Sequence, residues 1–286
     1  MTSLLDSWIS GIPSLGSYAA VLEEIERVLS DPQSTLSSVG EVIEKDPDLA
    51  ARLLKLGNSS FFGFPTRIET VSETISLIGI QQVQDLISVS VVVRVFEGLP
   101  ADLVNMSTFW RHSLACGTAA RILAVAKRAS KPEKYFVAGL LHDVGRLVLY
   151  MKAPQMAREV FHRAQRGRCL MRDAEREVMG FDHTEIGEAL LESWNYPANL
   201  RASIRCHHAP MSGGAYQLEA SIVHVADVMV HAMGWGGSGE KWIPALHQRA
   251  WDRLALPVEA IESTMTAVDT QLAEVEQAFM RVAAVA

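Results

Sequence analysis

Hydrophobic residues recur at helical spacing along almost the whole chain, whereas the alternation typical of strands is rare. Asn-Gly and Asp-Gly, the pairs that favour tight hairpin turns, do not occur in the sequence. We therefore predict an all-α protein, with more than two-thirds of its residues in helices and no sheet. That is far above the helical content of about one-third in average globular proteins.

Capping residues mark where several of these helices begin. The pairs that signal a helix start are Asp46 with Pro47, Thr70 with Glu73, and Asp182 with Glu185. The stretch 133–150 is so apolar that it predicts one buried helix. Further helices are expected at 36–45, 49–56, 71–78, 81–97, 106–127, 154–166, 172–178, 183–194, 197–208 and 218–232.

The helical pattern is interrupted at Gly98-Leu99-Pro100, which predicts a boundary between two helical subdomains, 1–98 and 99–286. Near the C-terminus, apolar residues follow a heptad spacing. They are Ile261, Met265, Val268, Leu272, Val275, Phe279 and Val282. We favour a terminal helix docked on its own domain; the alternative is a homodimer through the 261–282 helix.

Composition narrows the class of protein. The chain has 286 residues, with 49% hydrophobic and 21% charged, enough for one large or two modest globular domains. Its net charge of −7 argues against a nucleic-acid partner. The apolar stretch 86–96 is too short to cross a bilayer, and residues 1–30 lack a signal peptide, so we expect no membrane partner. The three cysteines, Cys116, Cys169 and Cys206, have no paired spacing, which favours a reducing, cytoplasmic location.

The candidate chemistry begins with His142-Asp143, inside the apolar stretch. Two adjacent polar groups there cost several kcal/mol unless something satisfies them, and a divalent metal would do so. A buried, hydrogen-bonded pair is the alternative. Further candidate ligands are His112, His183, His207, His208 and Asp227. Imidazole and carboxylate suit Fe, Mn, Zn, Co or Ni, and two metals sharing a carboxylate would activate a water for hydrolysis.

The order of these residues resembles the HD superfamily of metal-dependent phosphohydrolases, and within it the HD-GYP phosphodiesterases with a binuclear centre. The resemblance implies one metal at His112, His142, Asp143 and Asp227. It implies a second metal at His183, His207 and His208, with Asp143 as the bridge. Fe or Mn is expected first, with Zn, Ni or Co as alternatives.

Several longer segments are similar to the HDOD family, the HD-related output domain of bacterial signalling proteins. The similar segments are 12–13, 44–63, 75–79, 109–112, 138–143 and 177–208. This resemblance covers roughly residues 10–230. It implies an HD-like helical bundle behind an N-terminal helical subdomain, and a regulatory role.

The sequence also departs from the catalytic relatives. Residues 209–214, Ala-Pro-Met-Ser-Gly-Gly, stand where the phosphodiesterases carry Gly-Tyr-Pro. Thr108 stands where trinuclear relatives place a Glu, so a third metal is not expected. Asp143 and Arg146 are the candidate catalytic residues. Arg146 replaces a common Lys, so it can hold a phosphate but cannot act as an acid or base.

Two functions follow from these observations. The first is a regulatory HDOD protein that relays signals through signalling proteins or a phosphate-containing small molecule. The alternative is a metal-dependent phosphohydrolase acting on nucleotides or cyclic dinucleotides, although we expect weak or undetectable hydrolysis of cyclic-di-GMP. His224 and His231 flank Asp227 on its predicted helix. We expect His224 in the core, His231 at the surface, and 234–239 as a mobile rim.

Overall fold

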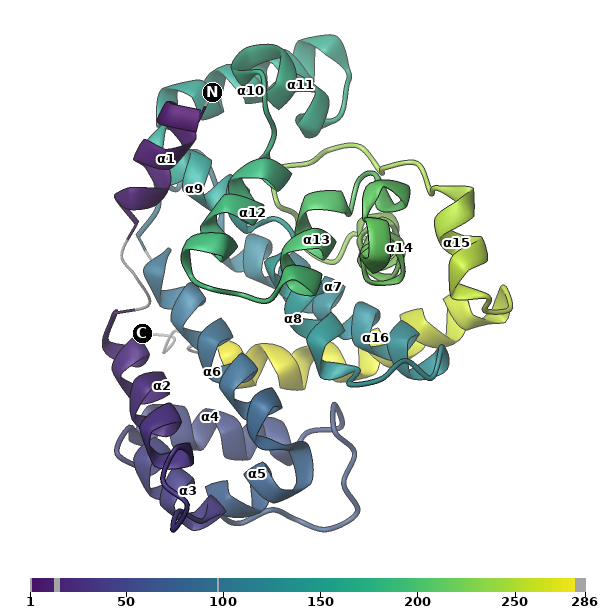
Figure 1. Cartoon of the computed structure of the whole chain (residues 1–286). Coiled ribbons are helices and arrows are strands. Elements are labelled where there is room, and N and C mark those ends of the chain that lie inside the picture. Colours follow the sequence, from purple (N-terminus) through teal and green to yellow (C-terminus); the bar gives the residue numbers. More distant parts are fainter. Residues whose placement is uncertain (1, 13–15, 97, 281–286) are drawn as a thin grey trace, which may run out of the picture. The chain divides into compact units, whose positions relative to one another are not determined.

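The computed structural model describes residues 2–12, 16–96 and 98–280. It is 72% helical, and no strand occurs in the described part (Figure 1). The predicted all-α fold is therefore confirmed. No helix within these ranges has the length and apolar character needed to cross a membrane.

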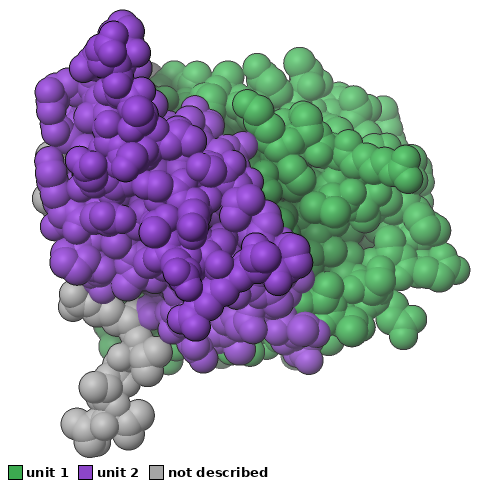
Figure 2. Space-filling model, turned by 90° about the horizontal axis from the view of Figure 1, so that it is seen from below, with its two compact units in different colours: residues 1–12, 96–268 green, residues 13–95, 269–286 purple. Residues whose placement is uncertain are grey.

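The chain forms two compact units, coloured separately in Figure 2. Unit 1 comprises residues 1–12 and 96–268, and unit 2 comprises 13–95 and 269–286. The change of unit at 95–96 lies close to the predicted break at Gly98. The two chain ends belong to other units than predicted: residues 1–12 group with the later part of the chain, and residues 269–286 group with the earlier part. Local periodicity carries no information about such long-range grouping.

Unit 2 is built from short helices around an apolar core. They are α2 (Gly16–Leu29), α3 (Leu36–Glu44), α4 (Pro47–Gly57), α5 (Val71–Ile78) and α6 (Ile80–Val95). The Asp46 carboxylate accepts the backbone N–H groups of Asp48 and Leu49, and Thr70 and Glu73 form the predicted capping box. These caps satisfy amides that the first helical turn leaves unpaired.

Besides part of α16 (Glu259–Phe279), which is divided between the two units, unit 1 holds ten further helices within the described residues. They are α1 (Thr2–Ser10), α7 (Met106–Ala126), α8 (Glu133–Leu141), α9 (Val144–Lys152), α10 (Pro154–Gly167), α11 (Met171–Met179), α12 (His183–Ser193), α13 (Ala198–Cys206), α14 (Gln217–Met233) and α15 (Gln248–Leu254). Two short 3₁₀ turns, Pro210–Ser212 and Gly214–Tyr216, precede α14. Helix α7 packs against α8 and α14, while α12 packs against α9 and α13. The Asp182–Glu185 capping box at the start of α12 is as predicted.

The prediction of one helix over 133–150 was wrong, since the structure divides it into α8 and α9 with a turn at His142-Asp143. The His142 ring donates from Nδ1 to the Gly139 carbonyl over 2.7 Å. Asp143 has φ −101° and ψ 9°, in the sparsely populated bridge region where active-site residues are often found. The Arg146 N–H then donates to the Asp143 carbonyl and begins α9. Because the residues on both sides of the turn are apolar, the hydrophobic pattern does not indicate a break between two helices.

Helix α16 (Glu259–Phe279) carries the heptad seam. The later seam residues, Val268, Leu272, Val275 and Phe279, are all buried within the chain, whereas Ile261 and Met265 are partly exposed. Val282 lies outside the described residues. The favoured docking of this helix on its own domain holds only for its first half, because the residues from 269 onward group with unit 2; a homodimer through 261–282 stays a prediction.

Candidate metal centre

All seven predicted metal ligands come together inside unit 1. The turn between α8 and α9 supplies His142 and Asp143, and α7 supplies His112. The other ligands are His183 at the first residue of α12, His207 and His208 directly after α13, and Asp227 in α14. The four histidines His112, His142, His183 and His207 have no exposed surface, and each Asp is 1% exposed.

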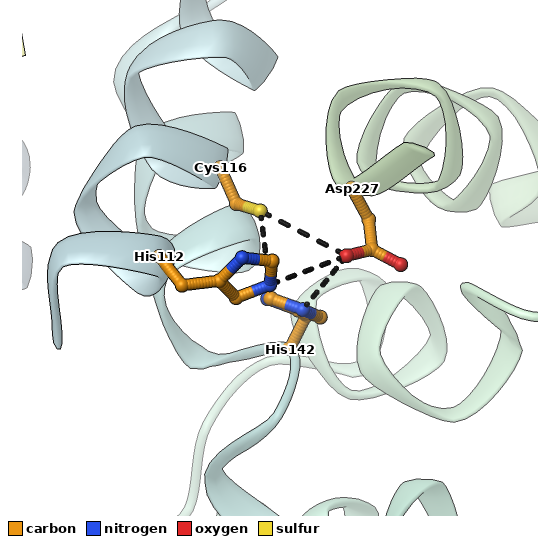
Figure 3. A group of neighbouring side chains, drawn as sticks. All are labelled: His112, Cys116, His142 and Asp227. Carbon is orange, nitrogen blue, oxygen red and sulfur yellow. Dashed lines mark hydrogen bonds and ion pairs between the residues drawn. The ribbon is translucent and has the colours of Figure 1, made fainter. Parts of the chain in front are cut away.

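One group of donors surrounds Asp227 (Figure 3). Its Oδ1 atom lies 3.3 Å from His112 Nε2 and 3.5 Å from His142 Nε2. Cys116 belongs to the same group, with Sγ 3.6 Å from His112 Nε2. The sequence analysis missed this cysteine. The available signal was its position four residues after His112, which places both side chains on one face of α7.

A second group of donors consists of His183, His207 and His208. His183 Nε2 lies 3.1 Å from His208 Nε2 and 3.1 Å from Asp143 Oδ1. The other oxygen of Asp143 lies 3.4 Å from His142 Nε2, in the neighbourhood of the first group. The Asp143 carboxylate therefore stands between the two groups, as a bridging ligand would.

Hydrogen bonds at the far side of three imidazole rings fix their orientation. Nδ1 of His142 donates to the Gly139 carbonyl, and Nδ1 of His207 donates to the Ile204 carbonyl over 2.8 Å. Nδ1 of His183 donates to the Glu175 carboxylate over 2.6 Å. In each ring Nε2 is left to face the centre, the arrangement that orients histidine ligands in metal sites.

Glu175 is a further functional residue that the sequence analysis missed. It is fully buried in α11 and accepts both the ring N–H and the backbone N–H of His183. Its eight-residue distance from His183 gives no periodic signal, because the bend at Gly180 separates their helices.

Among the buried atoms of the centre that have no hydrogen-bond partner are His142 Nε2, Asp143 Oδ1 and His207 Nε2. Buried polar atoms are almost always paired, because leaving one unpaired costs about 1–3 kcal/mol. A divalent cation would satisfy all three, and imidazole with carboxylate is a suitable donor set for transition metals. The residues therefore fit a metal centre.

The charges of the side chains in the centre are consistent with this interpretation. Burial alone would lower the pKa of His142, but the Asp143 and Asp227 carboxylates outweigh it and raise that pKa to about 10. Likewise, the Glu175 and Asp143 carboxylates outweigh burial and raise the pKa of His183 to about 9. Burial would raise the pKa of Asp143, yet Arg146 and His142 hold it well below its usual range. Without metal, protonated histidines thus neutralise the carboxylates that a cation would otherwise neutralise.

The expectation that His231 lies at the surface was wrong. Its side chain is 9% exposed, and its Nδ1 lies 2.8 Å from Asp227 Oδ1. Its ring packs edge-on against His112, with centroids 4.5 Å apart. The i,i+4 spacing from Asp227 brings it inward. His224, in contrast, is buried as expected, and its Nδ1 donates to the His207 carbonyl over 2.8 Å.

Arg146 reaches the same centre, but its guanidinium is already engaged. Nε lies 3.5 Å from Asp143 Oδ1, and Nη1 donates to the Ser238 hydroxyl over 2.7 Å. Ser238 is fully buried, and Tyr150 donates to its carbonyl. The segment 234–239, expected as a mobile rim, is therefore hydrogen-bonded across the centre at Ser238.

A glycine allows α9 and α12 to approach closely enough to build the centre. A Cβ added at Gly145 would lie 2.0 Å from the His183 carbonyl oxygen and 2.7 Å from the Gly187 nitrogen. Both of these are backbone atoms, so neither can yield without moving a helix. The absence of a side chain at Gly145 thus places Asp143 and His183 within reach of one another.

The fold and this centre define an all-helical protein with an HD-type constellation of histidines and aspartates. The HDOD domain model matches residues 15–210, and the chain belongs to this family. A protein of Treponema pallidum (strain Nichols), described as uncharacterized, is 29% identical over 225 residues. The match covers 78% of this chain but 42% of the Treponema protein, so this chain spans less than half the length of that relative.

Solved structures show the same fold. An HDOD domain protein of unknown function from Geobacter sulfurreducens is 22% identical, with a TM-score of 0.75 and coverage of 98% of each chain. A protein from Shewanella amazonensis SB2B, provisionally named a phosphohydrolase, is 22% identical with a TM-score of 0.74. The match covers 97% of this chain and 98% of the Shewanella chain. A second Shewanella protein, provisionally named a metal-dependent phosphohydrolase, has a TM-score of 0.69 at 20% identity, covering 97% of each chain.

Proposed function

We propose that this chain is a regulatory HDOD protein that holds divalent metal in its histidine–aspartate centre and signals through binding rather than turnover. The observation that carries this proposal is the inward-facing donor set: most of its side chains are almost completely buried, and donor atoms such as His142 Nε2 and His207 Nε2 have no hydrogen-bond partner. The partners in this proposal are signalling proteins or a phosphate-containing small molecule.

The residues divide naturally between two ions. His112, His142 and Asp227 would hold one, His183, His207 and His208 the other, and Asp143 would stand between them. When bound, such ions polarise phosphoryl oxygens and lower the pKa of a water. The Nδ1 hydrogen bonds of His142, His183 and His207 hold the rings in place whether or not an ion is present.

Burial favours binding over turnover. A phosphoester must reach the ligands to be cleaved, and it must be held in line with the attacking water. Apart from the partly exposed His208, the ligand side chains offer almost no exposed surface, and the Arg146 guanidinium already donates to Ser238. A substrate would have to displace that contact first.

A phosphohydrolase is the second candidate function, and the position of Arg146 is the observation in its favour. Its permanently charged guanidinium lies beside Asp143, where it could hold a phosphate next to the metal ligands. The two Shewanella relatives that are provisionally named phosphohydrolases point the same way. In that case Asp143 and Arg146 are the catalytic residues.

Metal content tests the first half of the proposal. We expect the purified full chain, reloaded after chelation, to retain divalent metal through gel filtration and to melt at a higher temperature than the chelated form. Asp143→Ala should lose most of the metal and its stabilisation. Asp252→Ala, which alters an exposed residue of α15, should keep both. A wild-type chain that binds no divalent metal would overturn the proposal.

A single-turnover assay with loaded protein tests the second half. We expect weak or undetectable conversion of cyclic-di-GMP and of nucleotide phosphoesters. Hydrolysis at about 1 per second or faster, lost in Asp143→Ala, would make the protein an enzyme and replace the regulatory function.

A further inference from the structure

Two histidines, a cysteine and an aspartate point their donor atoms at one position between α7, the α8–α9 turn and α14 (Figure 3). They are His112, Cys116, His142 and Asp227, and every pair of their donor atoms lies within 4.8 Å. All four side chains are buried, with at most 1% of any residue exposed. The sulfur lies 3.6 Å from His112 Nε2 and 4.0 Å from Asp227 Oδ1.

These separations discriminate between coordination geometries. Donors at about 2.0–2.3 Å from an ion at tetrahedral angles lie about 3.3–3.6 Å from one another. Adjacent donors around a small octahedral ion lie only about 3 Å apart. Four of the six donor separations here are 3.3, 3.5, 3.6 and 4.0 Å, which are nearer to the tetrahedral than to the octahedral spacing.

A buried cysteine is more often a small hydrophobic side chain than a ligand, and Cys206 illustrates that role. Cys206 belongs to no donor group among the residues that the structure describes. Cys116 differs because its sulfur faces both a carboxylate oxygen and a ring nitrogen. In addition, His142 Nε2 has no hydrogen-bond partner and points at the same position. That atom independently indicates a missing ligand.

We propose that Cys116 is a thiolate ligand of this ion, which makes the site selective for Zn²⁺ over Mn²⁺ or Mg²⁺. Binding breaks the S–H bond, forms a metal–sulfur bond and releases the proton to solvent. Thiolate is a soft donor that favours zinc, whereas the hard ions prefer oxygen. This inference rests on the proposed metal centre and adds to it a thiolate ligand and a metal preference.

Cobalt substitution gives a readout that does not depend on activity. Chelated full-length protein is titrated with Co²⁺, and the near-ultraviolet thiolate-to-cobalt charge-transfer band is recorded. We expect the band in the wild type and in Cys206→Ser, and its loss in Cys116→Ser. Competition between Zn²⁺ and Mn²⁺ should show the preference for zinc falling by about tenfold or more in Cys116→Ser.

X-ray absorption of the zinc-loaded wild type needs no variant, so it remains decisive if Cys116→Ser fails to fold. We expect a sulfur scatterer at about 2.3 Å, still present in Cys206→Ser. Metal that binds without any sulfur neighbour or charge-transfer band would overturn the thiolate ligand while leaving the metal centre intact. A wild type that binds neither cobalt nor zinc would overturn both.

Discussion

Units 1 and 2 are both all-helical, but they bury different kinds of side chain. In the described part of unit 2 the buried polar residues are Ser59, Thr74 and Ser88, and each hydroxyl donates to a backbone carbonyl three or four residues earlier. Unit 1 buries hydroxyl groups too, but it also buries charged and imidazole side chains. They are His112, His142, Asp143, Arg146, Glu175, Asp182, His183, His207, His224 and Asp227.

This difference separates the requirements of folding from those of function. A hydroxyl bonded to its own helix costs little to bury, so the core of unit 2 is explained by apolar packing. A buried charge costs several kcal/mol unless it is paired, and replacing such pairs with apolar residues often stabilises a protein. The charged centre of unit 1 is therefore not needed for a stable helical bundle, which indicates that it serves a ligand.

The largest effect is expected from removing the positive charge of Arg146. Arg146→Met leaves Asp143 and Glu175 as buried carboxylates without the guanidinium that lies 3.5 and 3.7 Å from them. We expect the free energy of unfolding, measured by urea denaturation in chelator, to fall by about 3–5 kcal/mol.

The same substitution at the exposed Arg253 of α15 is the control and should change stability by less than about 0.5 kcal/mol. If Arg146→Met is as stable as the wild type, charge pairing does not hold the centre together.

The stability of unit 2 should depend on the packing of its apolar core rather than on buried charges. Ile75, 1% exposed in α5, fills the apolar core, and Ile75→Ala should lower the free energy of unfolding by about 2–5 kcal/mol. Leu77→Ala, on the same helix but at a residue that is 51% exposed, should cost much less. Metal content should be unchanged in both variants, and loss of metal in Leu77→Ala would contradict the division between the units.

The pH dependence of stability should distinguish metal-free from metal-loaded protein. The pKa of His142 is raised from 6.5 to about 10 in the folded chain. Its stabilising contribution is therefore complete below pH 6.5 and is lost as the pH rises through about 10. We expect the melting temperature of the chelated protein to fall over this interval, and a bound metal, which replaces the proton, to flatten the decrease. Parallel curves for the two forms would show that His142 does not bind the metal.

The smallest effect is expected at a helix cap of unit 2. Asp46→Ala removes the carboxylate that accepts the first amides of α4, at a cost of about 0.5–2 kcal/mol. Asp46→Asn keeps an oxygen acceptor, so its free energy of unfolding should fall by only a few tenths of a kcal/mol. Metal content should not change, and equal losses in the two variants would show that the cap does not account for the effect.

Local features of the fold could be predicted because they depend on neighbours in sequence. The capping boxes at Thr70 and Asp182 and the buried seam of α16 were found from spacing alone. The turn at His142-Asp143 could not be, because the run that it interrupts is apolar on both sides of it. It exists because the His142 ring bonds the Gly139 carbonyl and Asp143 takes a bridge-region backbone.

For the candidate site, sequence reasoning named seven candidate ligands that could meet at one point, and the resemblance to HD proteins divided them between two metals. The sequence reasoning missed Glu175 and Cys116 and misplaced His231. Each of these residues contacts a side chain whose position depends on packing. Glu175 contacts His183, Cys116 contacts His112, and His231 contacts Asp227.

What the sequence by itself determined is the helical class and many of the helix starts and ends, since propensity, amphipathic period and caps act within one or two turns. Only the tertiary structure decided that residues 1–12 belong to unit 1 and residues 269–286 to unit 2. It also decided that α9 and α12 meet at Gly145 and that separate segments form one charged centre. The physical reason is that burial and charge pairing depend on groups far apart along the chain. The free energy of a buried histidine or carboxylate is set by the neighbours that the fold brings to it.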